Sequence, residues 1–232
     1  MGTAAIDRAE GSQAPPEVQA KRPRTWRDFV CRAVDLILAS VLLVVTTPLL
    51  IAIAIAISLD SRGPVLFRQR RLGRALRPFE VNKFRTMTHG ASHDVHRAFV
   101  LGLIAGETPQ RSEGEPRFKL VADKRVTAVG RFLRRSSLDE LPQLWNVVRG
   151  EMSLVGPRPP IPYEVEHYPP RWFGRFAVKP GITGLWQVSG RSELTLEEMI
   201  ALDLEYVARR SPLLNLWILL RTIPAVLRFR GA

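Results

Sequence analysis

The chain has 232 residues and a formal net charge of +12, from 34 Lys and Arg against 22 Asp and Glu. Its apolar fraction of 46% is ordinary for a folded chain, so the charge is the informative number. Such a basic chain indicates an anionic partner, either nucleic acid, an anionic membrane surface or a phosphorylated substrate, and composition does not choose among them. The single cysteine, Cys31, excludes an intrachain disulfide.

Residues 1–25 carry glycine, proline and mixed charge without apolar periodicity, which predicts a disordered N-terminal tail. The apolar run that follows begins too late for a secretory signal peptide. The remainder, residues 26–232, has a suitable length for a single domain.

The next feature is a run without charged residues from Leu36 to Leu59. As a helix it would reach about 36 Å, enough to cross a hydrocarbon core roughly 30 Å thick. Pro48 interrupts the run and follows Thr46 and Thr47. Proline removes one backbone hydrogen bond and predicts a sharp kink, and the threonine hydroxyls can bond the carbonyls that the kink frees.

Both flanks of this run are basic. The preceding flank has Lys21, Arg22, Arg24, Arg27 and Arg32, and the following flank has Arg62, Arg68, Arg70, Arg71, Arg74 and Arg77. The positive-inside rule places both flanks in the cytoplasm, which a helix–break–helix that enters and returns would satisfy. An ordinary spanning helix with a mild proline kink is the alternative, and the residues alone leave both open.

A β-hairpin is predicted next, with one strand over 64–70, a turn at 72–74 and a returning strand over 78–85. Residues 88–120 are polar and predict an irregular surface excursion. Three of the four histidines lie in it, namely His89, His93 and His96. Their i,i+3 and i,i+4 spacing could bind a metal, although a solvated loop or surface helix is the simpler interpretation.

Apolar spacing predicts a helix over 125–135, and a second short helix begins at Ser137. A proline-rich stretch of extended backbone follows, with Pro157, Pro159, Pro160 and Pro162. Helical spacing returns over 194–210. The final apolar segment, 213–229, contains Trp217 and is interrupted by arginines, which is typical of a helix in a membrane interface; a buried core helix is the alternative.

The densest group of polar residues surrounds Asp139 and Glu140. Ser137 and Glu140 fit the capping box of a helix start, which explains the pattern without any chemistry. The functional alternative depends on the directions of the two side chains. Neighbouring residues of a helix point about 100° apart, so Asp139 and Glu140 cannot share one proton. One carboxylate could then attack phosphorus and the other could bind a metal.

Basic side chains that could bind a substrate phosphate are Lys83, Arg85, Arg125, Arg134, Arg158 and Arg191. Any one of them taken alone could equally be a solvated surface charge. Arg158 differs, because prolines on both sides stiffen its backbone and a rigid backbone suits oriented phosphate binding.

Taken together, these motifs resemble the bacterial monotopic phosphoglycosyl transferases, also called bacterial sugar transferases. The matching stretches are the Thr47-Pro48 break and residues 63–73, 83–87, 137–159, 178–191 and 202–223. Several long motifs in order make the resemblance specific, and it extends from about residue 26 to the end.

The resemblance implies an α+β, mainly helical, monotopic membrane protein with a re-entrant broken helix at about residues 30–60, interfacial amphipathic helices and a small β-hairpin. Residues 61–232 would form the cytoplasmic catalytic part, on the inner membrane. Asp139 would attack the β-phosphate of a UDP-sugar, UMP would leave, and undecaprenyl phosphate would accept the phosphosugar. Glu140 would help hold Mg²⁺. Family basic positions correspond to Lys83, Arg134, Arg158 and Arg191.

The short form of the chain resembles enzymes that start exopolysaccharide units with galactose or glucose. Residues 88–120 are longer than the minimal family pattern. A homodimer through the C-terminal apolar helix is a further expectation. The alternatives are a basic membrane-attached protein that binds nucleic acid, for which no motif is present, and a non-enzymatic scaffold that would not need the Asp-Glu pair.

Overall fold

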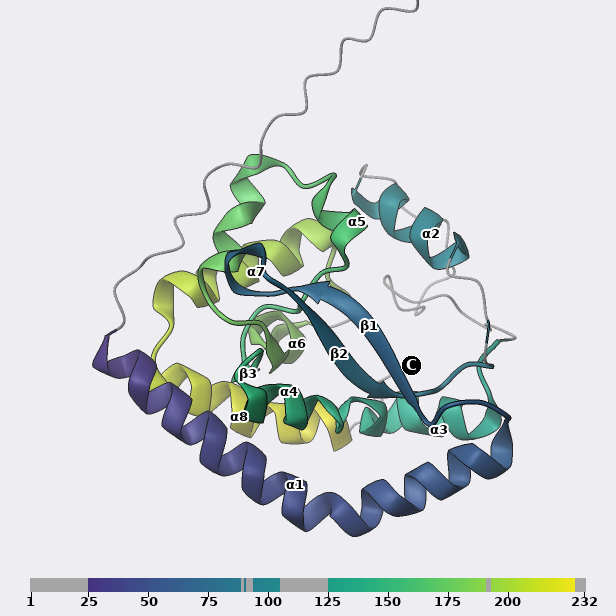
Figure 1. Ribbon diagram of the computed structural model, residues 1–232. Coiled ribbons are helices and arrows are strands. Elements are labelled where there is room, and N and C mark those ends of the chain that lie inside the picture. Colours follow the sequence, from purple (N-terminus) through teal and green to yellow (C-terminus); the bar gives the residue numbers. More distant parts are fainter. Residues whose placement is uncertain (1–24, 89, 91–93, 105–124, 191–192, 228–232) are drawn as a thin grey trace, which may run out of the picture.

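The computed structural model describes residues 25–88, 90, 94–104, 125–190 and 193–227. Its elements, shown in Figure 1, are α1 (Trp26–Asp60), β1 (Leu66–Leu72), η1 (Arg74–Leu76), β2 (Pro78–Phe84), α2 (Asp94–Ile104), α3 (Ala128–Ser136), η2 (Leu138–Glu140), α4 (Gln143–Arg149), β3 (Ser153–Val155), α5 (Pro162–Val165), η3 (Pro170–Ala177), β4 (Gly181–Thr183), α6 (Leu185–Ser189), α7 (Leu196–Arg209) and α8 (Pro212–Leu227). The mainly helical fold with a small hairpin is confirmed. The predicted tail, apart from residue 25, lies outside the described residues.

Helix α1 continues through Pro48 but bends near its middle (Figure 1). The hydroxyls of Thr46 and Thr47 donate to the carbonyls four residues earlier, at 2.6 and 2.7 Å. Those carbonyls belong to Leu42 and Leu43, so the threonines do not bond the Val44 carbonyl that loses its partner at Pro48. Such back-bonding itself bends helices, which adds to the effect of the proline.

Two polar side chains fasten the first half of α1 to the rest of the chain. The Arg32 guanidinium donates to two carbonyls at the end of α4, at 2.6 and 3.0 Å. One turn later, Asp35 accepts hydrogen bonds from the Ser153 hydroxyl at 2.7 Å and the Leu154 amide at 3.0 Å, at the start of β3. The apolar core packs behind these contacts, where α1, α4, β3, α6 and α8 meet.

Strands β1 and β2 form an antiparallel hairpin with residue pairs from Leu66–Phe84 to Leu72–Pro78. The ladder therefore includes Leu72, and the connection is the longer loop 73–77 where a turn at 72–74 was predicted. The left-handed backbone of this loop falls at Ala75 and Leu76, with φ of 54° and 58°, although Gly73 opens the loop. A second, parallel pair joins β3 to β4.

The predicted irregular excursion over 88–120 contains a helix, α2. Its last residue, Ile104, packs against an apolar cluster built around Trp172 and Phe176. The Arg97 guanidinium also lies 5.4 Å from the centre of the Tyr163 ring. These contacts give the helix a partly buried side. Residues 98–104 are apolar, and the prediction of a polar excursion overlooked this run. His89 and His93 lie outside the described residues, and so does the side chain of His96.

Candidate active site

The predicted helix from Ser137 is divided into two pieces, η2 and α4. Ser137 adopts a left-handed conformation, with φ of 58° and ψ of 16°, and its side chain makes no capping hydrogen bond. The capping box is therefore not formed, because the Glu140 carboxylate binds Lys83 and not the start of the helix. The short 3₁₀ turn of η2 instead presents Asp139 and Glu140 at the end of α3.

Lys83 and Glu140 form an ion pair with 2.6 Å between Nζ and Oε1, and their side chains are 22% and 31% exposed. Burial alone would raise the pKa of Glu140, but the charge and hydrogen bond of Lys83 outweigh burial and hold that pKa below its usual value. Glu140 is therefore a permanent anion at neutral pH.

Asp139, its neighbour, is partly buried and has the opposite electrostatic behaviour. Burial raises the pKa of Asp139 to about 6, and the negative charge of Glu140 adds to this rise, while Lys83 and Arg134 oppose it. Two adjacent carboxyl groups thus titrate in different ranges, which suits different roles. An aspartate that ionises just below neutral pH can act as a nucleophile.

Arg134 reaches this region because α3 lies close to the end of β2. Its Nε donates to the Thr86 hydroxyl at 2.9 Å. One turn earlier, a Cβ on Gly130 would lie 2.1 Å from the Thr86 carbonyl oxygen. Only glycine permits this approach of helix to backbone, so Gly130 helps to place Arg134 beside the acid pair.

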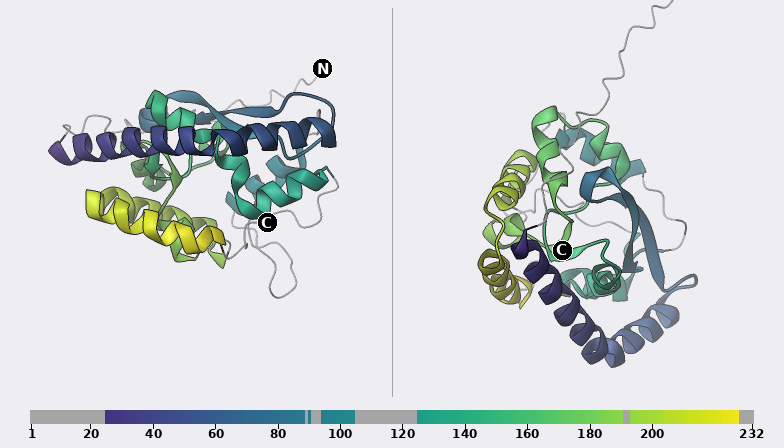
Figure 2. Two further views of the ribbon diagram at one scale, coloured as in Figure 1. Left: turned by 90° about the horizontal axis from the view of Figure 1, so that it is seen from below. Right: turned by 60° about the vertical axis from the view of Figure 1, so that its left-hand side comes forward.

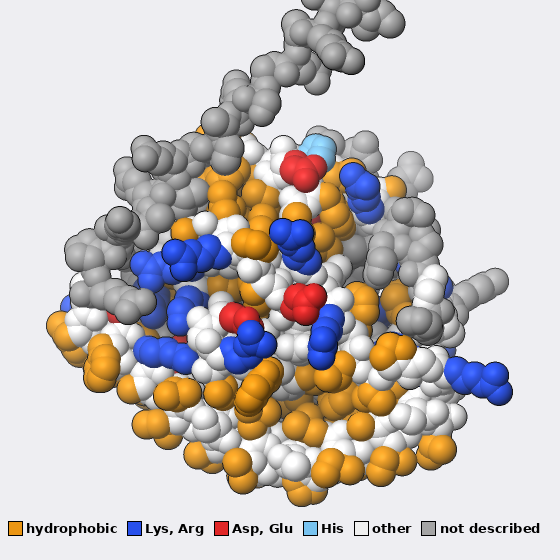
Figure 3. All heavy atoms as spheres, viewed as in Figure 1, with side chains coloured by type: hydrophobic (Ala, Val, Ile, Leu, Met, Phe, Trp, Pro, Cys, Tyr) orange, Lys and Arg blue, Asp and Glu red, His pale blue; other side chains and the backbone are white. Residues whose placement is uncertain are grey.

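Beside Glu140 there is a small pocket that is open to solvent. It is lined by Arg71, Val81, Lys83, Glu140, Gln143, Arg158, Pro159, Gly181, Ile182 and Gln187. On the face of the molecule that carries the hairpin, Figure 3 shows Lys and Arg side chains gathered around a few acidic ones. Three cationic side chains against one carboxylate in the pocket lining make it suited to a polyanionic ligand.

Arg71 was missed as a pocket residue, because its sequence position suggested only a flank of the membrane helix. It is buried; its guanidinium donates twice to Gln69 Oε1, at 2.6 and 3.0 Å, and once to the Pro159 carbonyl, at 2.9 Å. Burial, with the charge of Arg158, lowers the pKa of Arg71 to about 10. Strand alternation could have found it, since Lys83 pairs with Phe67 and shares a face with Gln69 and Arg71.

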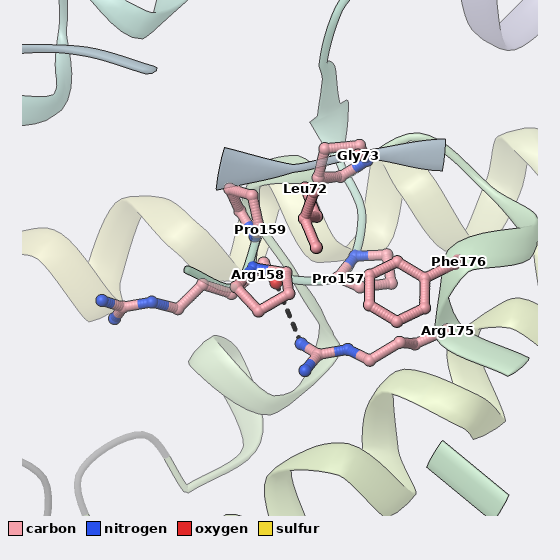
Figure 4. A pocket seen from close by; sticks show the side chains of 9 residues that line it. Leu72, Gly73, Pro157, Arg158, Pro159, Arg175 and Phe176 are labelled. Atoms are coloured by element: carbon pink, nitrogen blue, oxygen red, sulfur yellow. Dashed lines mark hydrogen bonds between the residues drawn. The ribbon is translucent and has the colours of Figure 1, made fainter. Parts of the chain in front are cut away.

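In the proline-rich segment beside the pocket, the backbone carbonyls of residues 157–160 all accept hydrogen bonds. The donors are Gly181 N to Pro157 O at 3.0 Å, Arg175 Nη2 to Arg158 O at 2.9 Å, Arg71 Nη1 to Pro159 O at 2.9 Å and Leu72 N to Pro160 O at 3.0 Å. Residues 157–161 lie in neither a helix nor a strand, whereas Pro162, which was predicted to be extended as well, begins helix α5. Figure 4 shows Arg175 beneath this segment and the Arg158 side chain pointing away from Phe176.

Arg175 is itself fixed by a buried ion pair. Its Nη2 lies 2.6 Å from Asp203 Oδ2, and the two side chains are 6% and 1% exposed. The Tyr168 hydroxyl accepts a further hydrogen bond at 3.2 Å. The backbone under Arg158 is thus tied to helix α7 through buried charges.

Other predicted phosphate-binding residues lie elsewhere. The Arg85 guanidinium is buried and donates to the carbonyls of Ser61 and Arg62, at 2.6 and 2.7 Å, so it closes the C-terminal end of α1. The Arg125 carbonyl accepts from the Thr88 amide at 2.9 Å, next to a bridge between the segments around residues 87 and 126. Arg191 lies outside the described residues.

The donors available to a metal are the two carboxylates of Asp139 and Glu140. Within the described residues, no group of three or more His, Cys, Asp or Glu side chains converges. Mg²⁺ is commonly bound by one or two carboxylates, with substrate phosphates and water completing its shell. Asp139 and Glu140 fit this kind of site, in which Glu140 would bind Lys83 and the ion together.

The chain belongs to the bacterial sugar transferase family, whose profile matches residues 26–229. It is 39% identical over 218 residues to the exopolysaccharide production protein ExoY of Rhizobium meliloti (strain 1021), covering 94% of this chain and 93% of that protein. It is 40% identical to a Caulobacter vibrioides UDP-glucose:undecaprenyl-phosphate glucose-1-phosphate transferase, covering 88% and 72%. It is 41% identical to the UDP-galactose-lipid carrier transferase of Erwinia amylovora, covering 88% of this chain but 42% of that one.

We predict that Asp203→Asn lowers the free energy of unfolding by about 3–5 kcal/mol, because it leaves the buried Arg175 charge unpaired. The same two elements, η3 and α7, carry a matched control in the exposed pair of Arg171 and Glu197, 67% and 70% exposed. Glu197→Gln should cost less than about 1 kcal/mol. Denaturant unfolding in one detergent measures both, and equal losses would contradict a supporting role for the buried pair.

Proposed function

We propose that this protein transfers a sugar 1-phosphate from a UDP-sugar to undecaprenyl phosphate and releases UMP. The observation that carries the proposal is the Asp139–Glu140 pair beside a basic pocket, with the pKa of Asp139 raised to about 6. Printed names of relatives support it, including the undecaprenyl-phosphate galactose phosphotransferase of Salmonella typhimurium. This chain spans 42% of that relative and of the Erwinia one, so the whole activity stands as a proposal.

The proposed reaction is two displacements at one phosphorus atom. An Asp139 oxygen attacks the β-phosphorus of the UDP-sugar, the bond from this phosphorus to the bridging oxygen breaks, and UMP leaves with the electron pair. A phosphate oxygen of undecaprenyl phosphate then attacks the same phosphorus and displaces Asp139. The products are undecaprenyl diphosphate sugar and a free aspartate, so the nucleophile is regenerated.

The cationic side chains have a complementary task. Lys83, Arg71 and Arg158 line the pocket and would offset the charge of the diphosphate, most of all as UMP departs. Mg²⁺, held by Glu140, would supply further charge neutralisation at the leaving phosphate. Lys83 also keeps Glu140 ionised and so ready to bind the metal.

The sugar is proposed to be galactose or glucose. Relatives of similar identity are named for each, in Salmonella typhimurium for galactose and in Caulobacter vibrioides and Komagataeibacter xylinus for glucose. The match to ExoY over almost its whole length favours a place at the first membrane step of exopolysaccharide synthesis.

We also propose that α1 enters the membrane and returns, so that both ends lie at the cytoplasmic face of the inner membrane. Its outward side is apolar, with Val44 74% exposed, and only 11% of its most apolar window is buried. Helix α8 runs alongside, as Figure 2 shows, and Leu213 on it is 79% exposed. So large an exposed apolar surface favours contact with lipid, and the basic flanks of α1 support a placement with both ends on one side.

With purified protein, Mg²⁺, undecaprenyl phosphate and a panel of UDP-sugars, we expect UMP release with a hexose donor. Asp139→Asn should lower the rate by roughly 10³-fold or more, because a near-isosteric amide cannot form the covalent bond. Glu197→Gln, an exposed carboxylate changed in the same way, is the control. Undiminished function of folded Asp139→Asn protein would favour the scaffold alternative.

A second expectation concerns pH. Because the pKa of Asp139 is about 6 and the anion is the nucleophile, kcat/KM for UMP release should be level above this pH. It should fall about tenfold per pH unit below it, as the carboxyl group gains a proton. Circular dichroism at each pH checks that the protein stays folded. A profile that is level down to pH 4.5 would contradict the raised pKa.

Membrane topology can be tested with single cysteines in a Cys31→Ala background. Trp26→Cys and Arg62→Cys mark the two ends of α1, and Val44→Cys marks its exposed middle. In oriented vesicles, an impermeant maleimide should label both end positions from the cytoplasmic side only and should not label Val44→Cys. Labelling of the two ends from opposite sides would establish a spanning helix.

A further inference from the structure

Gln187 is a pocket residue to which the proposed chemistry gives no role. It lies in α6 and lines the pocket together with Glu140, Lys83 and Arg158. Its amide oxygen Oε1 is buried, and among the described residues no donor reaches it. A buried acceptor without a donor is unfavourable, so a ligand that brings a donor to this oxygen binds better than one that does not.

The orientation of this amide is fixed by its surroundings. Its Nε2 donates to the Ile182 carbonyl at 3.1 Å, which leaves the oxygen as the other end of the amide group. A Cβ on Gly184 would lie 2.7 Å from Oε1 and 2.6 Å from the Gly156 carbonyl oxygen. Glycine at 184 therefore leaves room for the side chain in this orientation.

The neighbouring cations already have partners in the protein. Lys83 binds Glu140 at 2.6 Å, and the Arg71 guanidinium donates to Gln69 and to the Pro159 carbonyl. These charges suit phosphate groups. A neutral amide oxygen instead suits a neutral donor, and the neutral donors of a nucleotide sugar that lie next to its diphosphate are the hydroxyls of its two sugar rings.

We propose that Gln187 Oε1 accepts a hydrogen bond from one sugar hydroxyl of the nucleotide-sugar donor and thereby sets which donors the pocket accepts. The inference rests on the proposed function and adds a specificity-determining residue to it. A site built to bind a hydroxyl discriminates strongly against the analogue that lacks it, because its polar group is then left unpaired.

The test compares UMP release by wild type, Gln187→Met, Gln187→Glu and Ser189→Ala, an exposed position on the same helix. The donors are a UDP-hexose, its monodeoxy analogues and its analogue with 2′-deoxyribose. Wild type and Ser189→Ala should lose about tenfold or more in kcat/KM with one deoxy donor. Gln187→Met should not distinguish that donor, whereas Gln187→Glu, which keeps an acceptor oxygen, should.

The position of the sensitive hydroxyl tells whether the contact is to the hexose or to the ribose. Equal discrimination by wild type and Gln187→Met would overturn the inference while leaving the proposed function intact. Direct binding of the same donors to Asp139→Asn protein supplies a readout without turnover. If wild type neither binds nor cleaves any UDP-sugar, the proposed function fails and the inference fails with it.

Discussion

The four carbonyls of residues 157–160 are the constraint on which the candidate active site depends. Proline has no N–H, so this segment can be held mainly through its oxygens, and each accepts a hydrogen bond from a different donor. Those donors come from β1, η3 and the start of β4, which are distant in sequence. By fixing one short segment, the chain gathers the hairpin, the second strand pair and the aromatic cluster of η3 around a single pocket.

Buried arginines make two of these four bonds, and this has an electrostatic effect. Arg71 and Arg175 bring positive charge close to the pocket while their hydrogen bonds satisfy backbone oxygens. Asp203 balances Arg175, whereas Arg71 has only the neutral Gln69 and Pro159 as hydrogen-bond partners among the described residues. The pocket therefore keeps an excess of positive charge, which attracts phosphate groups and stabilises the Glu140 anion.

Local patterns and family motifs in the sequence allowed the mainly helical fold, the hairpin and the kink in the long helix to be predicted. The roles of Asp139 and Glu140 stay predictions. The sequence did not separate Arg71 from the basic flank of α1, and it placed Arg85 among phosphate-binding residues. Both errors have one cause. The sequence does not distinguish one arginine of a basic stretch from another, because the role of each depends on which carbonyls, distant in sequence, accept its hydrogen bonds. Likewise, the sequence predicts Ser137 as a helix cap paired with Glu140. In the structure the Glu140 carboxylate binds Lys83 on strand β2, so this capping box does not form.

Helix α1 is fastened to the rest of the chain at several points along its length. Arg32 binds α4, and Asp35 binds β3. At the other end, the Asp60 carboxylate accepts from the Val129 amide at 3.3 Å, and Arg85 donates to the Ser61 carbonyl just past the helix. On the proposed membrane placement, the depth of α1 in the bilayer fixes the height of Asp139 relative to the lipid phosphates. The phosphate of the lipid substrate could then stay in the headgroup plane of the leaflet that α1 enters while it meets Asp139.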